Sequence, residues 1–371
     1  MTELYLGLMS GTSLDGIDGV LVEFIQTRQT VIAGASASMP PALRQEFLDL
    51  NRAGHNELHR AALAANALAR IYAGVVDALL KQAGVFPSAV RAIGAHGQTV
   101  RHQPQAFDST GYTLQLNNPA LLAELCGIDV IADFRSRDVA AGGQGAPLVP
   151  AFHRAVFGRP GSEVAVLNLG GMANLTVLGA ADEGNVLGFD CGPGNVLLDA
   201  WCLQHQGEPF DSGGTWAASG HVDAELLNRM LTEPFFAQVP PKSTGRDLFN
   251  PPWLAAALTP SATVSAADVQ ATLAELTAYS CADAVQTYAP ASSELLVCGG
   301  GAYNQHLMRR LQALLPTRKV SDTLLRGLPP LQVEAAAFAW LARQTVRREP
   351  GNLKKVTGAL GARVLGAIYP A

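Results

Sequence analysis

A polar loop near the start of the chain separates two apolar runs within LGLMSGTSLDGIDGVLVEF, residues 6–24. It offers oxygen atoms and bare backbone but no positive charge, and its residues are Ser10, Gly11, Thr12, Ser13, Asp15, Gly16 and Asp18. Successive N–H groups in such a loop can point at an anion, and carboxylates can hold the waters of Mg²⁺. The loop therefore predicts a site for phosphate with Mg²⁺, with Asp15 and Asp18 as metal candidates. The alternative is a plain hairpin in which Asp15 makes an Asx turn.

Two further glycine turns follow apolar strands later in the chain. EVAVLNLGGMANLTVLG, residues 163–179, repeats the order of strand, turn and strand, whereas ELLVCGGGAYN, residues 294–304, leads from a strand into a helix. The chain has no GxxxxGK[ST] and no GxGxxG after a strand, which excludes a P-loop and a dinucleotide fingerprint. One such turn alone is more often a tight hairpin. Three in this order favour ATP, with two turns at the phosphates and Gly299–Gly301 against the adenosine.

Asp190 is the candidate catalytic carboxylate. In GFDCGPGN it ends a short apolar strand and precedes Gly192, Pro193 and Gly194. A helix is expected to begin near Asn195, so glycine backbone and a helix N-terminus would surround the carboxylate, which suits a general base. The alternative is an acid that caps this helix, but Asn195 can cap it already.

Other polar residues lie at the ends of expected elements. Glu334 opens the helical EAAAFAWLARQTV, either as a hydrogen-bond partner of substrate or as a complement to the helix dipole. His96 and Gln98, in GAHGQTV, end a strand and are assigned to substrate binding or domain connection. The segment KSTGRD, residues 242–247, brings Lys242 as a candidate phosphate partner, although a solvated loop is the simpler interpretation.

Two arginines, Arg135 and Arg137, follow a strand in DFRSRD. A guanidinium fork is well suited to grip a ligand carboxylate. The alternative for each is a structural ion pair with Asp133 or Asp138. The sequence leaves both interpretations open.

Composition describes a compact globular protein. The chain has 371 residues, 48% of them hydrophobic and 15% charged, with net charge −5. The length favours two domains, and the negative charge argues against nucleic acid or an anionic membrane as a partner. No stretch approaches the roughly 20 apolar residues of a membrane span. The cysteines form no CxxC motif, which together with apolar neighbours predicts free thiols in a reducing cytoplasm; they are Cys126, Cys191, Cys202, Cys281 and Cys298.

Hydrophobic periodicity places helices over residues 40–53 and 57–84 and strands on both sides of the first two glycine turns. A small-residue loop after "DFR" is a plausible boundary. The α/β chain is therefore divided into residues 1–134 plus 336–371 and residues 135–335. The returning tail is suggested by RVLGAIYP, a short apolar strand that needs a sheet to join.

The motifs also carry a family resemblance. The three glycine turns resemble those of the acetate/sugar kinase, heat-shock and actin superfamily. More narrowly, the chain resembles the anhydro-N-acetylmuramic acid kinase family through MSGTSLDGID, GAHGQT, ADFRSRDVAAGGQGAPLVP, NLGGMANLT, GFDCGPGN, FDSGG, KSTGRDLFN and VCGGGAYN. The resemblance covers nearly the whole chain. It implies two actin-like (ribonuclease H-like) α/β domains with an ATP cleft between them, and a homodimer.

The resemblance further implies an ATP- and Mg²⁺-dependent reaction that opens a 1,6-anhydro sugar bridge by hydrolysis and phosphorylates O6, with Asp190 activating water. The expected ATP-binding residues are Gly11, Thr12, Ser13, Leu14, Asp15, Gly16, Ile17, Asp18, Asn168, Gly170, Gly171, Asn174, Gly299, Gly300 and Gly301. The expected substrate-binding residues are His96, Gln98, Arg135, Gly192, Gly194, Asn195 and Glu334. Rival interpretations are a kinase of another sugar, a nucleotide-driven chaperone, and a glycosidase that works without ATP through two carboxylates.

Overall fold

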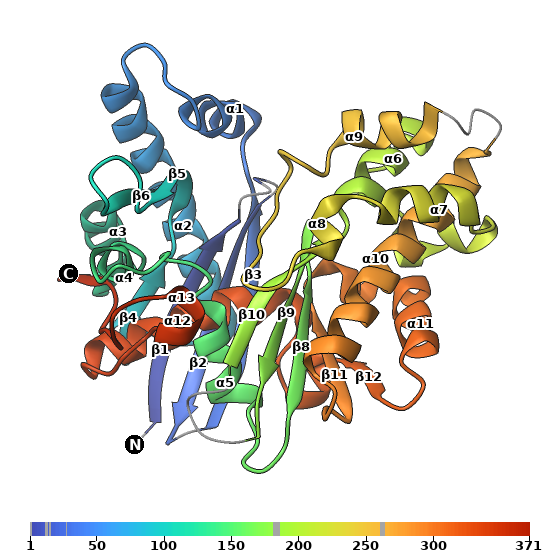
Figure 1. Cartoon of the computed structure of the whole chain (residues 1–371). Coiled ribbons are helices and arrows are strands. Elements are labelled where there is room, and N and C mark those ends of the chain that lie inside the picture. Colours follow the sequence, from blue (N-terminus) through green and yellow to red (C-terminus); the bar gives the residue numbers. More distant parts are fainter. Residues whose placement is uncertain (1, 12–13, 15, 27, 181–185, 260–263) are drawn as a thin grey trace. The chain divides into compact units, whose positions relative to one another are not determined.

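The chain forms two compact units in a computed structural model that describes residues 2–11, 14, 16–26, 28–180, 186–259 and 264–371 (Figure 1). The first unit comprises residues 1–156 and 332–371, and the second comprises residues 157–331. The first unit thus continues past residue 134, where the sequence places the boundary.

Contacts between residues 135–156 and the C-terminal tail explain the later boundary. Asp138 accepts hydrogen bonds from Asn352 Nδ2 at 2.6 Å and from Thr357 Oγ1 at 2.8 Å. The ring of Phe152 packs on that of Trp340, with centroids 6.2 Å apart. Residues 135–156 therefore belong to the same core as the C-terminal tail.

A six-stranded mixed sheet forms the centre of the first unit, in the order β13-β7-β4-β1-β2-β3. Its strands are β1 (Thr2–Ser10), β2 (Gly16–Ile25), β3 (Arg28–Ser38), β4 (Val90–Ala95), β7 (Val130–Ala132) and β13 (Ala367–Tyr369). Strands β1, β2 and β3 are antiparallel neighbours, and β4 and β7 continue the sheet in parallel with β1. The tail strand β13 pairs with β7, so the expected return of the tail to the first sheet is confirmed.

Helices and a small hairpin complete this unit. They are α1 (Pro41–Leu50), α2 (Glu57–Ala83), η1 (Pro87–Ala89), β5 (Gln98–Pro104), β6 (Gly111–Leu116), α3 (Pro119–Cys126), α4 (Ser136–Ala140), α5 (Val149–Phe157), α12 (Val333–Val346) and α13 (Lys354–Thr357). Helix α5 ends one residue beyond the boundary between the units.

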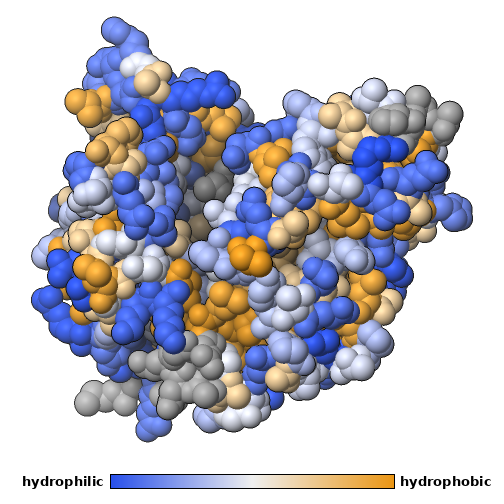
Figure 2. Space-filling view, viewed as in Figure 1, coloured by the Kyte–Doolittle hydropathy of each residue, from blue (hydrophilic) through white to orange (hydrophobic). Residues whose placement is uncertain are grey.

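Helix α2 is the one described helix whose length and composition would allow it to cross a membrane. The expectation that no stretch approaches this length is therefore wrong for α2. Only 44% of its most apolar window is buried, yet the buried side chains include Leu68, Tyr72, Val75 and Leu79, which belong to the core of the first unit. Figure 2 shows mostly hydrophilic residues over α1 and the start of α2, at the upper left. These features are those of a core helix with one solvated face.

Close packing of α12 on the sheet depends on two glycines. Gly7 and Gly94 are partners across β1 and β4. A Cβ atom on Gly7 would lie 1.9 Å from the carbonyl oxygen of Ala335, and one on Gly94 would lie 2.0 Å from that of Phe338. The helix backbone thus approaches the sheet to a distance that a side chain would prevent. This contact fixes the first turn of α12, which carries Glu334.

The second unit is built on a five-stranded sheet in the order β10-β9-β8-β11-β12. Its strands are β8 (Val164–Leu169), β9 (Met172–Leu178), β10 (Val186–Pro193), β11 (Glu294–Cys298) and β12 (Lys319–Asp322). Its helices and helical turns are α6 (Val196–Gln206), η2 (Ser212–Gly214), η3 (Ala217–Ser219), α7 (Ala224–Leu231), α8 (Pro234–Ala237), α9 (Pro251–Leu258), α10 (Ala266–Tyr288), η5 (Gly300–Tyr303), α11 (Gln305–Leu314), η6 (Thr323–Arg326) and η7 (Pro330–Gln332).

Both units use one sheet order. In each, an antiparallel meander of three strands is followed by two strands that run parallel to the first, giving β3-β2-β1-β4-β7 and β10-β9-β8-β11-β12. The expected duplication is confirmed at the level of topology, and the units are α/β domains of the actin-like (ribonuclease H-like) type. The first two glycine turns occupy equivalent places, at the first hairpin of each sheet, and the third follows β11.

We expect Gly94→Ala to destabilise the protein by about 1–3 kcal/mol, the usual effect of overpacking. The added Cβ would clash with a backbone carbonyl oxygen and not with a flexible side chain. The matched control is Gly74→Ala in α2, where an added Cβ meets nothing within 4 Å. That change should stabilise by about 0.5–1 kcal/mol through helix propensity. Urea midpoints measure both. Equal midpoints for Gly94→Ala and the unaltered protein would contradict the packing account.

Candidate functional site

A polar row crosses three neighbouring strands of the second unit. Asn168 on β8 pairs with Asn174 on β9, and Asn174 pairs with Asp190 on β10. On the other side of β8, Cys298 of β11 is the partner of Asn168 and its thiol lies 3.8 Å from Asn168 Oδ1. Directly paired residues of adjacent strands present their side chains on the same face. The register therefore gathers three of the predicted site residues in one line.

Asp190 ends the regular part of β10. The register shifts between Asp190 and Gly192, so that Cys191 is the extra residue of a β-bulge, and bulges of this kind re-aim side chains next to functional sites. The carboxylate Oδ2 accepts a hydrogen bond from the Thr244 backbone N–H at 2.9 Å. Burial raises the pKa of Asp190, opposed by this hydrogen bond and by the charge of Lys242. A carboxylate with a raised pKa is a stronger base than a solvated one.

The glycine segment after Asp190 packs on the turn between β8 and β9. Gly194 N donates to Gly171 O and Asn195 N to Gly170 O, each at 2.9 Å. Asn195 precedes α6, but its side chain makes no cap and instead donates to Leu169 O at 3.0 Å. The expectation that Asn195 caps α6 is therefore wrong, because its amide bridges two loops.

The third glycine segment lies against the same turn. A Cβ on Gly299, whose φ is +81°, would be 2.5 Å from Asn168 Oδ1. A Cβ on Gly301 would be 2.5 Å from the side chain of Leu169, and one on Gly300 would be 3.8 Å from Asn195 Nδ2. The structure thus brings the predicted ATP residues of the second unit together with Asn195.

Gly171 differs from these tightly packed glycines. A Cβ placed there would meet no atom within 4 Å among the described residues. The backbone of the turn is therefore open to a ligand at this position. Gly192, in contrast, has φ +149° and a Cβ there would lie 2.7 Å from the ring of Phe236, so its lack of a side chain serves packing.

The polar loop of the first unit joins β1 to β2 as a hairpin, with Ser10 paired to Ile17. Leu14 is buried, and its N–H donates to Gly11 O at 3.2 Å. Gly16 begins β2. The predicted residues Thr12, Ser13 and Asp15 lie outside the described residues.

Asp18 is exposed and lies opposite Met9 at the base of this hairpin. Among the described residues, no group of three or more His, Cys, Asp or Glu side chains is placed to hold a metal. A single exposed carboxylate still suits Mg²⁺, which keeps several of its waters and needs few protein ligands. The Asp18 side chain therefore fits the predicted role, through water.

Buried polar residues form a chain beside the hairpin. Arg135 donates from Nη2 to His96 Nε2 at 2.9 Å, and His96 Nδ1 lies 3.2 Å from Ser10 O. Burial and the charge of Arg135 lower the pKa of His96 to about 3. His96 is therefore neutral, with its proton on Nδ1 donated to Ser10 O. The Ser10 hydroxyl donates in turn to Gln98 Oε1.

Arg135 is a partly buried cation. Its Nη1 donates to Gly145 O at 2.9 Å, and no carboxylate of the described residues lies within 4 Å of it. Burial lowers the pKa of Arg135 to about 10, opposed by the charges of Glu334 and Asp138. The alternative of an Arg135–Asp138 ion pair is not formed, because Asp138 accepts from Gly145 N at 2.8 Å and from the tail instead. A guanidinium in this setting is suited to an anionic ligand.

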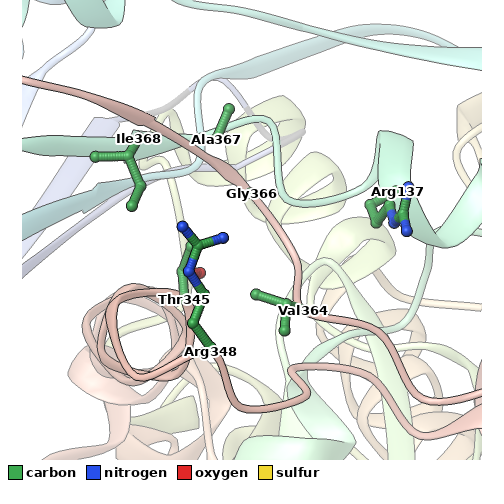
Figure 3. A pocket seen from close by; sticks show the side chains of 7 residues that line it. All are labelled: Arg137, Thr345, Arg348, Val364, Gly366, Ala367 and Ile368. Atoms are coloured by element: carbon green, nitrogen blue, oxygen red, sulfur yellow. The ribbon is translucent and has the colours of Figure 1, made fainter.

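Arg137 lies elsewhere. It lines a pocket of about 450 Å³ with Arg348 of the α12 C-terminus and Val364 of the tail (Figure 3). The two arginines of DFRSRD thus lie at different places in the first unit. His96 and Gly145 contact Arg135, and the charge of Glu334 acts on it.

The segment KSTGRD contacts Asp190. The sequence alone favours a solvated loop for this segment. Lys242 O accepts from Asp190 N at 3.1 Å. The Lys242 ammonium lies 4.7 Å from the centroid of the Phe235 ring and 3.3 Å from Phe235 O. Because the segment and Asp190 are far apart in the chain, their contact leaves no local signal in the sequence beyond the small polar residues of the loop.

Comparisons with known proteins agree over the full length. The family model described as anhydro-N-acetylmuramic acid kinase matches residues 3–371. Proteins of that name from Albidiferax ferrireducens and Variovorax paradoxus are each 64% identical to the chain; the first alignment covers 100% of both chains, and the second covers 100% of this chain and 99% of the relative. A protein of the same name from Ralstonia nicotianae is 60% identical, over 100% of this chain and 98% of the relative.

Among solved structures, the activator of the 2-hydroxyisocaproyl-CoA dehydratase from Clostridium difficile with bound ADPNP aligns at 12% identity with a TM-score of 0.48, over 93% of this chain and 96% of that one. The match extends from residue 3 to the last residue and includes every glycine turn described above. The chain belongs to the anhydro-N-acetylmuramic acid kinase family.

Proposed function

We propose that this protein uses ATP to open the 1,6-anhydro bridge of 1,6-anhydro-N-acetylmuramic acid and to phosphorylate O6, giving N-acetylmuramic acid 6-phosphate and ADP in cell-wall recycling. Family membership supports the substrate and the phosphoryl donor. The observation that carries the chemistry is Asp190, a carboxylate with a raised pKa at a strand end among three glycine segments.

The reaction needs a base for water and none for the sugar. The bridge oxygen is O6 itself and carries no proton. Asp190 takes a proton from water as the water oxygen bonds to C1 and the C1–O6 bond breaks. O6 then bonds to the γ-phosphorus and ADP leaves, so the phosphoryl group replaces the general acid of an inverting glycosidase.

Nucleotide binding is assigned to the glycine turns and to the polar row. Backbone N–H groups of the Gly11–Ile17 loop and of Gly170–Gly171 would meet phosphate oxygens. The Gly299–Gly301 segment would face the adenosine. Mg²⁺, held through water by Asp18 and Asp15, would neutralise triphosphate charge.

Sugar binding is assigned to Arg135. N-acetylmuramic acid carries a lactyl carboxylate. Arg135 is partly buried and is held by His96 and Gly145, whereas Arg137 is exposed, which supports Arg135 over Arg137. Glu334 lies close enough to raise the pKa of Arg135 and is the proposed hydrogen-bond partner of sugar hydroxyls or water. Because both nitrogens of His96 are engaged within the protein, His96 holds Arg135 and does not contact the sugar.

We further propose a homodimer in the cytoplasm. All five cysteines are free thiols and four of them are buried, which suits a reducing compartment. Sedimentation and fractionation test these two statements independently of the chemistry.

An ADP-release assay with the anhydro sugar, with the product identified by mass, tests the function. Equal turnover of an ordinary hexose would favour another sugar kinase. In the same assay, Asp190→Asn should lower kcat by more than about 10³-fold, the scale for a base acting with phosphoryl transfer. ATP affinity should be unchanged. A variant that retains a tenth of the activity would exclude Asp190 as the base.

The raised pKa of Asp190 also predicts an effect on stability and a pH dependence of kcat. Because the pKa of Asp190 is raised by folding, its ionised form costs stability above that pKa. Asp190→Asn should therefore unfold no more easily than the unaltered protein at neutral pH. For the unaltered protein, kcat should fall with acidification at a pH above about 4, the ordinary value for Asp.

Gly171→Val tests the nucleotide assignment. A Cβ at this position meets no described atom within 4 Å, whereas a phosphate resting on the turn would collide with the valine side chain. We expect Kd for MgATP to rise about tenfold or more, with an unchanged urea midpoint, by calorimetric titration. Unaltered ATP affinity in this variant would remove the β8–β9 turn from the nucleotide site.

A further inference from the structure

The segment 242–244 covers the free edge of β10 at the position of Asp190. Among the described strands, β10 is the outer strand of its sheet and pairs with β9 alone. Asp190 N donates to Lys242 O at 3.1 Å, and Thr244 N donates to Asp190 Oδ2 at 2.9 Å. Main chain and side chain of Asp190 are thus held by the same short segment.

This arrangement makes the two carboxylate oxygens unequal. Oδ2 is occupied by the Thr244 N–H. Within the described part of the chain, Oδ1 accepts no hydrogen bond. Oδ1 is therefore the oxygen that can take a proton from water.

The hydroxyl of Thr244 is an unused polar group beside this carboxylate. Its Oγ1 is buried and has no hydrogen-bond partner among the described residues. It is only a few covalent bonds from the N–H that contacts Oδ2. A hydroxyl without a partner can accept a hydrogen bond from a group that arrives with the substrates.

We propose that Thr244 is a positioning residue for the attacking water, an inference that rests on the proposed function. The water donates one hydrogen to Asp190 Oδ1 and the other to Thr244 Oγ1. Its lone pair is thereby turned away from both groups and toward C1. As the oxygen bonds to C1, the first proton passes to Asp190 and the second stays on the new anomeric hydroxyl.

The test compares Thr244→Val, which keeps the shape and loses the hydroxyl, with Thr244→Ser, which restores it. We expect Thr244→Val to lower kcat for the anhydro sugar about 10- to 100-fold, the range for one lost orienting hydrogen bond. KM for MgATP should be unchanged, and Thr244→Ser should recover most of kcat. The matched control is Ser243→Ala, which removes an exposed hydroxyl from the same segment and should leave kcat unchanged.

Two readouts separate positioning from a structural role. The Thr244 N–H lowers the pKa of Asp190; Thr244→Val keeps this N–H, so the acid limb of kcat should stay in place. A broken segment would move that limb to higher pH. Because Oγ1 has no partner in the described protein, Thr244→Val should not lower the melting temperature.

Unaltered kcat in Thr244→Val, failure of Thr244→Ser to recover activity, or a loss accompanied by a shifted acid limb would each overturn the inference. Asp190→Asn distinguishes this failure from that of the proposed function. If Asp190→Asn is inactive while Thr244→Val is fully active, only the role of Thr244 is wrong. If Asp190→Asn is active, the proposed base is wrong as well.

Discussion

Backbone approaches that only glycine permits fix the geometry of both units. In the first, Gly7 and Gly94 let α12 lie directly on β1 and β4. In the second, a Cβ on Gly194 would lie 2.4 Å from Gly170 O, so the loop after Asp190 rests on the β8–β9 turn. Each contact sets the end of a strand or helix that carries a charged site residue. A side chain at these positions would displace the site as well as the core.

Asp190 and Arg135 are charged groups that the protein partly buries without an ion pair among the described residues. Asp190 has a raised pKa and a single backbone hydrogen bond to its carboxylate. Arg135 has a lowered pKa and donates to a neutral histidine and a carbonyl. Such groups cost stability and are retained where a ligand completes their surroundings.

Local patterns in the sequence were sufficient to predict the hairpins, the strand before Gly299 and the returning tail strand, because apolar runs and glycine turns are short-range signals. The row of Asn168, Asn174 and Asp190 depends on strand register, which the sequence does not show. The contacts of Lys242 and Thr244 with Asp190 join residues more than 50 positions apart. The capping role expected of Asn195 failed for the same reason, since its amide found a partner on another loop.

The central claim is that water, activated by Asp190, attacks C1 while the former bridge oxygen receives the phosphoryl group. Reaction in H₂¹⁸O with early quenching tests it most directly. The account predicts label at the anomeric oxygen, none in the phosphate ester oxygen, and an α-anomer formed first, because attack opposite the β-configured bridge inverts C1. A phosphorylated product with an intact bridge, or label found only in inorganic phosphate, would contradict it.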